Sequence, residues 1–383
     1  MTLLLVIIYL AFISLGLPDS ILGAAWPIMY ADLNTTVAAA GIIALVISIG
    51  TVISSLASTK VIYLFGTGKI VAISVLLTAL SLYGFTNAQS VFQLMLLSVP
   101  LGLGAGAIDA ALNSFVAKNY QAKHMNYLHA CWGIGATLGP MIMAMHLAQD
   151  QSWREGYKSI AYIQFALVFV LILALPLWSK LSKQLSCNSI DNHYVSNFAA
   201  LSIRGVKLQL LLFFCYCALE ASTGLWAASY LTIKWSTSTT DAAFWTAMFF
   251  LSITLGRFCS GFFTRFFTET LIIEAAVTCM LLGVLLLLSE YSLFLAKIGL
   301  VLIGLGCAPI YPNTLHLTST RFNKSASQAI IGLTMACAYL GSTLMPSLMG
   351  LIANYSSFSA FPSVLLILSL AVGWASYRLK SLA

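Results

Sequence analysis

The sequence has few charged residues for its length. Only 8% of its 383 residues are Asp, Glu, Lys or Arg, whereas 60% are hydrophobic. An ordinary soluble domain carries about 25% charged residues. The composition therefore excludes a soluble globular protein and indicates a chain that lies largely in lipid.

Signatures of enzymes and of resident metals are also lacking. The sequence has no G-x-S-x-G elbow, no H-E-x-x-H pair, no G-x-x-x-x-G-K-[ST] loop and no paired Asp-rich motif. Its eight Cys residues lack the spacing of metal ligands and lie mostly in apolar segments, which is typical of small buried hydrophobic residues. We expect neither an enzyme nor a bound cofactor or metal.

The sequence does contain a series of apolar stretches of about 20 residues, the length of a membrane-spanning helix. Its start, MTLLLVIIYLAF, has no basic region and no cleavage site, so we expect a retained first span and not a signal peptide. We predict an all-α polytopic membrane protein with spans near residues 3–30, 37–58, 69–86, 91–117, 126–147, 158–178, 207–231, 242–264, 270–288, 292–317, 327–353 and 359–377.

Basic residues accumulate in every second gap between these spans. Because Lys and Arg are enriched in cytoplasmic loops, we predict that both termini are cytoplasmic and that the number of spans is even. The same distribution accounts for the net charge of +7 without a nucleic-acid partner. We expect a multi-pass protein of the cell membrane, in bacteria the inner membrane, with the lipid bilayer as its surroundings.

One long polar gap and an internal repeat divide the chain. We predict an N-terminal six-helix half at residues 1–180, a cytoplasmic linker at 181–206 and a C-terminal six-helix half at 207–383. Matching residues occur in the same order in both halves, as expected for a parallel repeat. The clearest matches pair Asp19 with Glu220, Gly102 with Gly304, Gly104 with Gly306, and Gly135 with Gly341.

Three acidic residues lie more than about a turn inside apolar spans. An ionisable group in a membrane helix costs about 2.5 to 3.5 kcal/mol, so it points by default into a bundle or a watery path. We predict that Asp19, Asp109 and Glu220 face one chamber between the halves and couple protons to transport. Asp19 could instead cap a helix that is broken at Pro18. Asp109, with Asn113 at i+4, could instead form a polar bridge between spans. Glu220 needs a partner from another helix, or else must be protonated.

Other polar and aromatic residues in the spans are candidates for hydrogen bonds to a solute or for stacking on it. Each has a structural alternative, and His129 can equally relay protons. Trp26 and Tyr230 lie near span ends and fit the aromatic belt at a membrane interface. The substrate-binding candidates are Asn113, His129, Gln164, Trp226, Tyr311 and Asn313.

The motifs GLPDSILGAAWP, GLGAGAIDAALN, LGRFCSGFFTRF and GLGCAPIYPN, with the six-plus-six plan, resemble the major facilitator superfamily over essentially the whole chain. They look most like its fucose:proton-symporter-type branch and bacterial sugar permeases. The resemblance implies two halves that rock around a central solute site, with acids in the first and fourth spans.

The resemblance also implies a charged cytoplasmic gate in the loop between the second and third spans. Here the sequence departs from the family, because Tyr63 and Leu64 stand where the acid and the arginine of the usual motif would be. The identity of the gate residues is therefore open. The remaining gate candidates are Gly66, Lys69, Arg257 and Arg265.

These features favour a secondary active transporter that moves a small polar solute, a sugar or sugar-like molecule, by proton-coupled symport. Sodium is not ruled out as the coupling ion, and we expect a monomer. The alternatives are a proton-driven drug or lipid efflux antiporter and, from another class, an intramembrane enzyme or a sensor that does not transport.

The coupling role of Asp109 yields a direct prediction. Asp109→Asn removes a titratable carboxyl but keeps its size, so we expect uphill solute uptake to be abolished in proteoliposomes with an imposed proton gradient. Full accumulation by this variant would remove Asp109 from the coupling role.

Overall fold

The computed structural model describes residues 2–120, 122–178, 200–322, 324–356 and 358–381. In this part of the chain the regular elements are all helices. They are α1 (Thr2–Asp32), α2 (Ala39–Phe65), α3 (Thr67–Thr86), α4 (Val91–Asn119), α5 (Ala122–Ala148), α6 (Trp153–Leu173), α9 (Val206–Trp235), α10 (Thr239–Phe263), α11 (Glu269–Leu288), α12 (Leu293–Cys307), α13 (Ile310–Arg321), α14 (Lys324–Ser356) and α15 (Ala360–Lys380).

Twelve helical segments of the described chain are long and apolar enough to cross a membrane. This confirms the all-α membrane fold, and each segment overlaps one predicted span. The tenth span differs in detail, because it is built from two helices, α12 and α13, that meet at Ala308 and Pro309. Pro309 and Pro312 stand only three residues apart here, so two N–H groups of neighbouring helical hydrogen bonds are missing at the break.

Helix α1 continues through both of its prolines, Pro18 and Pro27. The alternative in which Asp19 caps a helix broken at Pro18 is therefore wrong. Asp19 lies inside a continuous helix, where a carboxylate does not serve as a cap.

The chain divides into two compact units. The first comprises Met1–Ser189 and Thr237–Ala247, and the second comprises Ile190–Ser236 and Met248–Ala383. The boundaries predicted at residues 180 and 206 stay a prediction, because residues 181–199 of the intervening linker lie outside the described residues.

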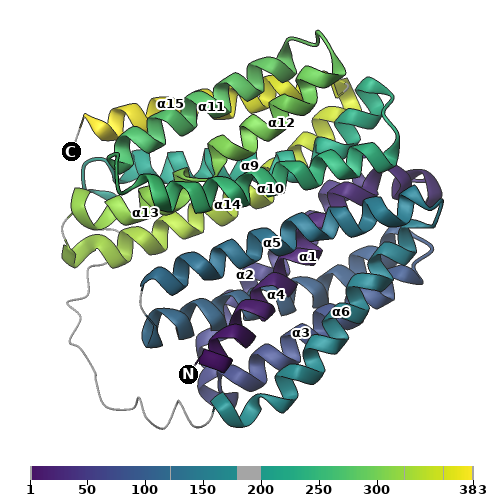
Figure 1. Cartoon of the computed structure of the whole chain (residues 1–383), viewed down its shortest axis with the longest axis horizontal. Coiled ribbons are helices and arrows are strands. Elements are labelled where there is room, and N and C mark those ends of the chain that lie inside the picture. Colours follow the sequence, from purple (N-terminus) through teal and green to yellow (C-terminus); the bar gives the residue numbers. More distant parts are fainter. Residues whose placement is uncertain (1, 121, 179–199, 323, 357, 382–383) are drawn as a thin grey trace. The chain divides into compact units, whose positions relative to one another are not determined.

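In the first unit, α1 packs against α5 and α6, and α4 packs against α2 and α3 (Figure 1). The contact between α1 and α5 is unusually close. A side chain at Gly135 would overlap the carbonyl oxygen of Ile13, and one at Gly16 would overlap that of Trp132. Small residues allow such close packing in membranes, where no hydrophobic driving force draws helices together.

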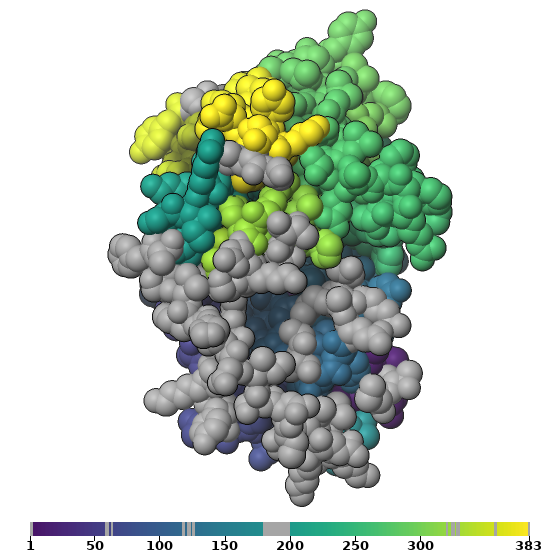
Figure 2. All heavy atoms as spheres, turned by 90° about the vertical axis from the view of Figure 1, so that its left-hand side faces the viewer, coloured from purple at the N-terminus to yellow at the C-terminus, as the bar shows by residue number. Residues whose placement is uncertain are grey.

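The second unit repeats this contact. Its first helix, α9, packs against α14 and α15, and a side chain at Gly341 would overlap the carbonyl oxygen of Phe214 on α9. Gly341 is the repeat partner of Gly135, so the matched glycines make the same contact in both units. Figure 2 shows the end of α15, in yellow, at the surface of this unit beside green residues of the same unit.

The glycines of the fourth and tenth spans follow the same rule. Gly102 in α4 faces α2 and Gly104 faces α3, while their repeat partners in α12 face α10 and α11. A Cβ at Gly104 would lie 2.7 Å from the Ser74 carbonyl oxygen, and one at Gly306 would lie 2.6 Å from that of Ala276. The glycines that match between the two halves of the sequence therefore make the same helix–helix contacts in both units.

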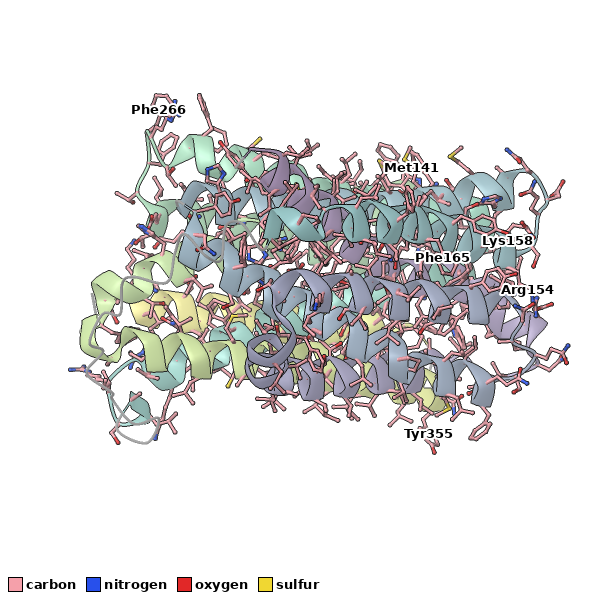
Figure 3. The ribbon with its side chains drawn as sticks, turned by 90° about the horizontal axis from the view of Figure 1, so that it is seen from below. Met141, Arg154, Lys158, Phe165, Phe266 and Tyr355 are labelled. Carbon is pink, nitrogen blue, oxygen red and sulfur yellow. The ribbon has the colours of Figure 1, made fainter. Side chains whose placement is uncertain are left out.

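Large apolar side chains cover the outer faces of the helices, as expected for surfaces in contact with lipid. Met145 on α5 and Tyr355 on α14 are 60% and 87% exposed, and Figure 3 shows Tyr355 pointing away from its helix. Trp26 and Tyr230, in contrast, are fully buried, and each donates a hydrogen bond to a backbone carbonyl. Their assignment to an interface belt is wrong.

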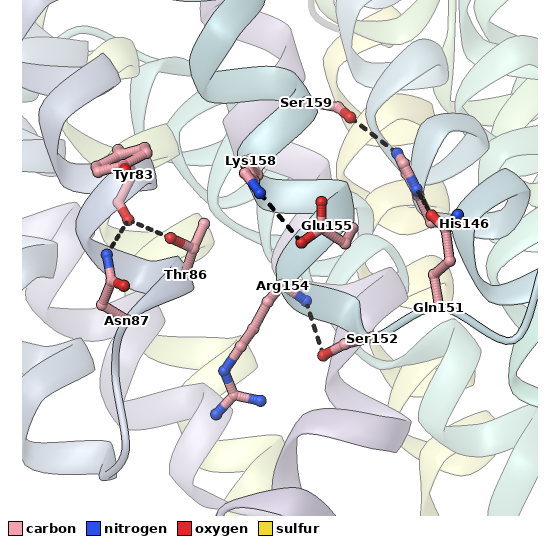
Figure 4. Close-up of polar contacts among 10 residues, drawn as sticks. All are labelled: Tyr83, Thr86, Asn87, His146, Gln151, Ser152, Arg154, Glu155, Lys158 and Ser159. Carbon is pink, nitrogen blue, oxygen red and sulfur yellow. Dashed lines mark hydrogen bonds and ion pairs between the residues drawn. The ribbon is translucent and has the colours of Figure 1, made fainter.

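Polar contacts connect the start of α6 to neighbouring segments. They lie at the end of the first unit that is opposite the N-terminus of the chain. The Arg154 guanidinium lies 2.6 Å from the Asp32 carboxylate and donates to the Ala88 carbonyl at 3.1 Å. Ser152 accepts a hydrogen bond from the Arg154 backbone N–H and so caps α6 (Figure 4). His146 at the end of α5 contacts Ser159 at 2.8 Å.

The glycine contacts predict the stability of single variants. Gly135→Ala and Gly341→Ala each place a methyl group against a backbone carbonyl, and we expect each to destabilise the fold by about 1 to 3 kcal/mol. Gly332→Ala is a matched control, because its Cβ would meet nothing within 4 Å and alanine favours a helix. Thermal unfolding of the purified protein measures all three; equal melting temperatures would contradict the packing argument.

Candidate functional site

Asp19 lies in the middle of α1 and is the most accessible polar group in its surroundings. Its side chain is exposed, although the neighbouring residues Pro18 and Ser20 are buried. The indole N–H of Trp132 on α5 donates a hydrogen bond to the Asp19 Oδ2 atom at 2.7 Å. The close approach of α1 and α5 at Gly16 is what brings the indole within reach. A carboxylate at this depth must face water and not lipid.

Asp109 and Asn113 lie one turn apart on α4 and are half-buried. The Asn113 amide nitrogen donates to the Asp109 carboxylate at 2.9 Å, so the two share a face as predicted from their spacing. The Asn113 amide oxygen is buried and accepts no hydrogen bond within the described chain. The Asp109 carboxyl also lies close enough to Asp19 for the two to interact electrostatically. The first unit therefore holds two communicating acids.

Glu220 lies in the middle of α9 in the second unit. The guanidinium of Arg257 on α10 approaches its Oε1 atom at 3.4 Å, and the hydroxyl of Tyr216, one turn earlier, donates to its Oε2 atom. The Glu220 and Arg257 side chains are only 14% and 15% exposed. The structure thus supplies the partner from another helix that an acid in this apolar segment requires.

Residues of α13 extend this second cluster. The Tyr311 ring lies 6.4 Å from that of Tyr216, the residue that donates to Glu220. Asn313 is buried, and its amide donates to the Ser260 hydroxyl at 3.1 Å. Tyr311 therefore belongs with the charged pair, whereas the contact of Asn313 favours a role in holding α13 to α10.

Two predicted substrate ligands are buried in contacts between helices. Gln164 on α6 donates to the Ser14 carbonyl on α1 at 2.9 Å and accepts from the Thr78 hydroxyl on α3. Trp226 on α9 is fully buried and donates to the Pro346 carbonyl on α14 at 2.8 Å. Both arrangements favour helix packing over solute binding. His129, in contrast, is half-buried with its ring edge against Phe12.

The gate candidates do not form one group. Gly66 joins α2 to α3 with φ of +81°, a conformation that favours glycine, and Lys69 is exposed one turn into α3. Arg265 is exposed beyond α10 with its guanidinium 5.9 Å from the Phe262 ring centroid. Because Arg257 pairs with Glu220, we assign it to that cluster and not to the gate.

Sequence reasoning missed the aromatic donors to the acids. Tyr216 lies four residues before Glu220, a spacing at which helical side chains meet, so it could have been found. Trp132 is 113 residues from Asp19, and nothing in the sequence links the two. The pairing of Arg257 with Glu220 was missed because Arg257 was interpreted through the family's gate motif.

The charged pair predicts non-additive effects on stability. Glu220→Gln or Arg257→Gln alone leaves a poorly solvated charge without this partner, and we expect a loss of about 3 kcal/mol or more. The double variant should be more stable than either single variant, because no charge remains. Glu274→Gln is the control: it breaks a more exposed pair with Lys380, worth about 1 kcal/mol or less. Additive losses in thermal unfolding would contradict the pairing.

Known proteins resemble this chain in sequence and in fold. The sequence profile of the Major Facilitator Superfamily matches residues 8–193. The glucose/mannose transporter GlcP of Bacillus subtilis is 24% identical, over 73% of this chain and 70% of that one. Among solved structures, a D-xylose-proton symporter superposes with a TM-score of 0.79 at 12% identity, covering 98% of this chain and 96% of that one. The nucleoside transporter NupG superposes with a TM-score of 0.77 at 14% identity, covering 99% and 98%.

At these identities the solved structures show the fold alone. The superfamily profile lies over the helices that hold Asp19 and Asp109, and the twelve spans give the rest of the chain a similar helical architecture. The chain is a multi-pass membrane protein with the fold of these transporters, and its residues 8–193 match the major facilitator superfamily.

Proposed function

We propose that this transporter is a proton-coupled symporter of sugars. The observation that carries the proposal is the setting of Asp19, an accessible carboxylate in the middle of a membrane helix that is hydrogen-bonded to the neutral indole of Trp132. The names of two similar proteins, a glucose/mannose transporter and a D-xylose-proton symporter, support a sugar as the solute.

We assign proton binding and release to the first unit. The hydrogen bonds to Asp19 and Asp109 come from neutral groups, an indole and an amide. A neutral donor stabilises a carboxylate less than a cation does, so we assign proton binding and release to these two acids and not to the acid that faces Arg257. The two carboxyls interact electrostatically, so a negative charge on one disfavours a negative charge on the other.

We assign binding of the sugar to the charged pair of the second unit. Glu220 is engaged by the Arg257 guanidinium and the Tyr216 hydroxyl, so we assign it to sugar binding and not to proton coupling. A carboxylate accepts hydrogen bonds from sugar hydroxyls and a guanidinium donates to them. The Tyr311 ring, beside Tyr216 in the same unit, offers an apolar face to a sugar ring.

Coupling follows from the cost of carrying an ionised acid through a closed, dehydrated state. A bound sugar displaces water from the site, so the loaded carrier changes access only with Asp19 protonated; the empty, hydrated carrier returns with Asp19 ionised. One proton moving down a membrane potential of 100 mV supplies about 2.3 kcal/mol. That energy supports about 50-fold accumulation of a neutral sugar.

Transport in proteoliposomes tests the proposal. We expect D-glucose, D-mannose or D-xylose to enter against its gradient when the interior is alkaline, and added sugar to raise the external pH. Asp19→Asn should still exchange internal for external sugar but should lose both uphill uptake and the pH change. Glu155→Gln, which alters an exposed acid of α6 paired with Lys158, is the control and should behave as the parent.

Other outcomes separate the alternatives. Uptake driven by a sodium gradient and not by a proton gradient would show that sodium is the coupling ion. Uptake of uridine without any sugar would replace the solute class. Expulsion of the apolar cation tetraphenylphosphonium in exchange for protons would establish the efflux antiporter in place of the symporter.

A further inference from the structure

A histidine that the proposed site does not use lies near the start of α5. The ring Nδ1 atom of His124 is 2.9 Å from the hydroxyl of Tyr9 on α1. The rings of Tyr120 and Tyr127 pack edge-on against it, with centroids at 5.7 and 6.2 Å. Tyr9 and His124 are both half-buried. This polar pair therefore links the two helices that also carry Asp19 and Trp132.

The pair lies in line with the acids along the helix axes. His124 is eight residues before Trp132 on α5, and Tyr9 is ten residues before Asp19 on α1. At 1.5 Å per residue, these separations place the pair about 12 to 15 Å from the Asp19 carboxylate. The displacement is toward the end of the unit that we predict to be cytoplasmic. His129 lies between, three residues from Trp132 and five from His124.

The described side chains around the Tyr9–His124 pair are aromatic or carry sulfur. The described titratable groups that face the pair are the phenols of Tyr120 and Tyr127 and the thiol of Cys131, and none of these is a carboxylate. Burial raises the pKa of the Tyr120 phenol, which therefore stays neutral. Histidine is the side chain whose ordinary pKa lies between pH 5 and 8.

We propose that His124 releases the transported proton to the cytoplasm and that Tyr9 positions its ring. The proposal rests on the proposed symport function and adds its exit step. A carboxylic acid of the Asp19–Asp109 pair loses its proton and becomes a carboxylate. The proton passes by His129 and water to a ring nitrogen of His124, which becomes an imidazolium. That nitrogen is Nε2, because Nδ1 is held by the Tyr9 hydroxyl; Nε2 then gives the proton to cytoplasmic water, and the neutral imidazole is restored.

The test separates proton release from movement of the halves. Exchange of internal for external D-glucose needs no net release of protons, whereas uphill uptake does. We therefore expect His124→Gln to slow uphill D-glucose uptake and the accompanying pH change at least tenfold while exchange stays within twofold of the parent. Tyr9→Phe removes only a hydroxyl and should give a smaller loss of the same kind.

A second histidine of α5 provides the control. His146 lies at the opposite end of the helix, in contact with Ser159, and His146→Gln should keep uphill uptake and exchange at parental rates. The melting temperature of each variant shows whether it is folded, and Tyr9→Phe carries the test should His124→Gln not fold.

Each other outcome overturns the proposal in a recognisable way. Parental uphill uptake by both variants would show that His124 and Tyr9 take no part, with the symport function intact. Equal loss of exchange and of uphill uptake would make the pair a structural link between α1 and α5. A parent protein that moves no proton with any of the three sugars would overturn the symport function and this exit step together.

Discussion

A carboxylate inside a membrane helix is tolerated only where other groups stabilise it, and that constraint organises this protein. Asp19 and Glu220 occupy matching positions in the first helix of each unit, and both receive a hydrogen bond from an aromatic side chain. The donor to Asp19 comes from α5, and the donor to Glu220 comes from its own helix. Each acid therefore has an aromatic hydrogen-bond donor, but Asp19 receives its hydrogen bond from another helix and Glu220 from its own helix.

Glycine packing makes the first arrangement possible. Trp132 reaches Asp19 because the backbones of α1 and α5 nearly touch at Gly16 and Gly135. In the second unit Gly341 makes the equivalent contact between α14 and α9. Close packing of the first helix on the fifth is thus common to both units, while the side chains that it brings together have diverged. Repeated architecture with divergent side chains is what a transporter needs if one half is to carry the ion and the other the solute.

The sequence was sufficient for the membrane-spanning helices and for the acids, because both follow from local hydropathy. A stretch of 20 apolar residues has one stable structure in lipid, and an acid within it stands out. The partners of the acids could not be predicted, because Trp132 and Arg257 reach them from distant helices through the packing. Burial of Trp26 and Tyr230 was missed for the same reason: an aromatic residue near the end of a span looks identical in sequence whether it faces headgroups or another helix.

The break between α12 and α13 shows the limit of hydropathy more directly. The apolar character continues through Ala308 and Pro309, so the segment counts as one span by composition, yet the backbone forms two helices. The break starts a new helix whose first turn carries Tyr311, beside the Tyr216 that holds Glu220.

The contrast between the units also bears on how the membrane potential acts. Glu220 and Arg257 form a pair without net charge, so the field exerts little force on them during a conformational change. In the proposed symport Asp19 gains and loses its charge, and a protonated Asp19 crosses the field uncharged while an ionised one does not. The potential therefore acts on the state of the first unit. A neutral sugar adds no charge, so in this scheme the membrane potential does work only on the proton. That work can drive accumulation of the sugar only if the loaded and the empty carrier differ by one charge.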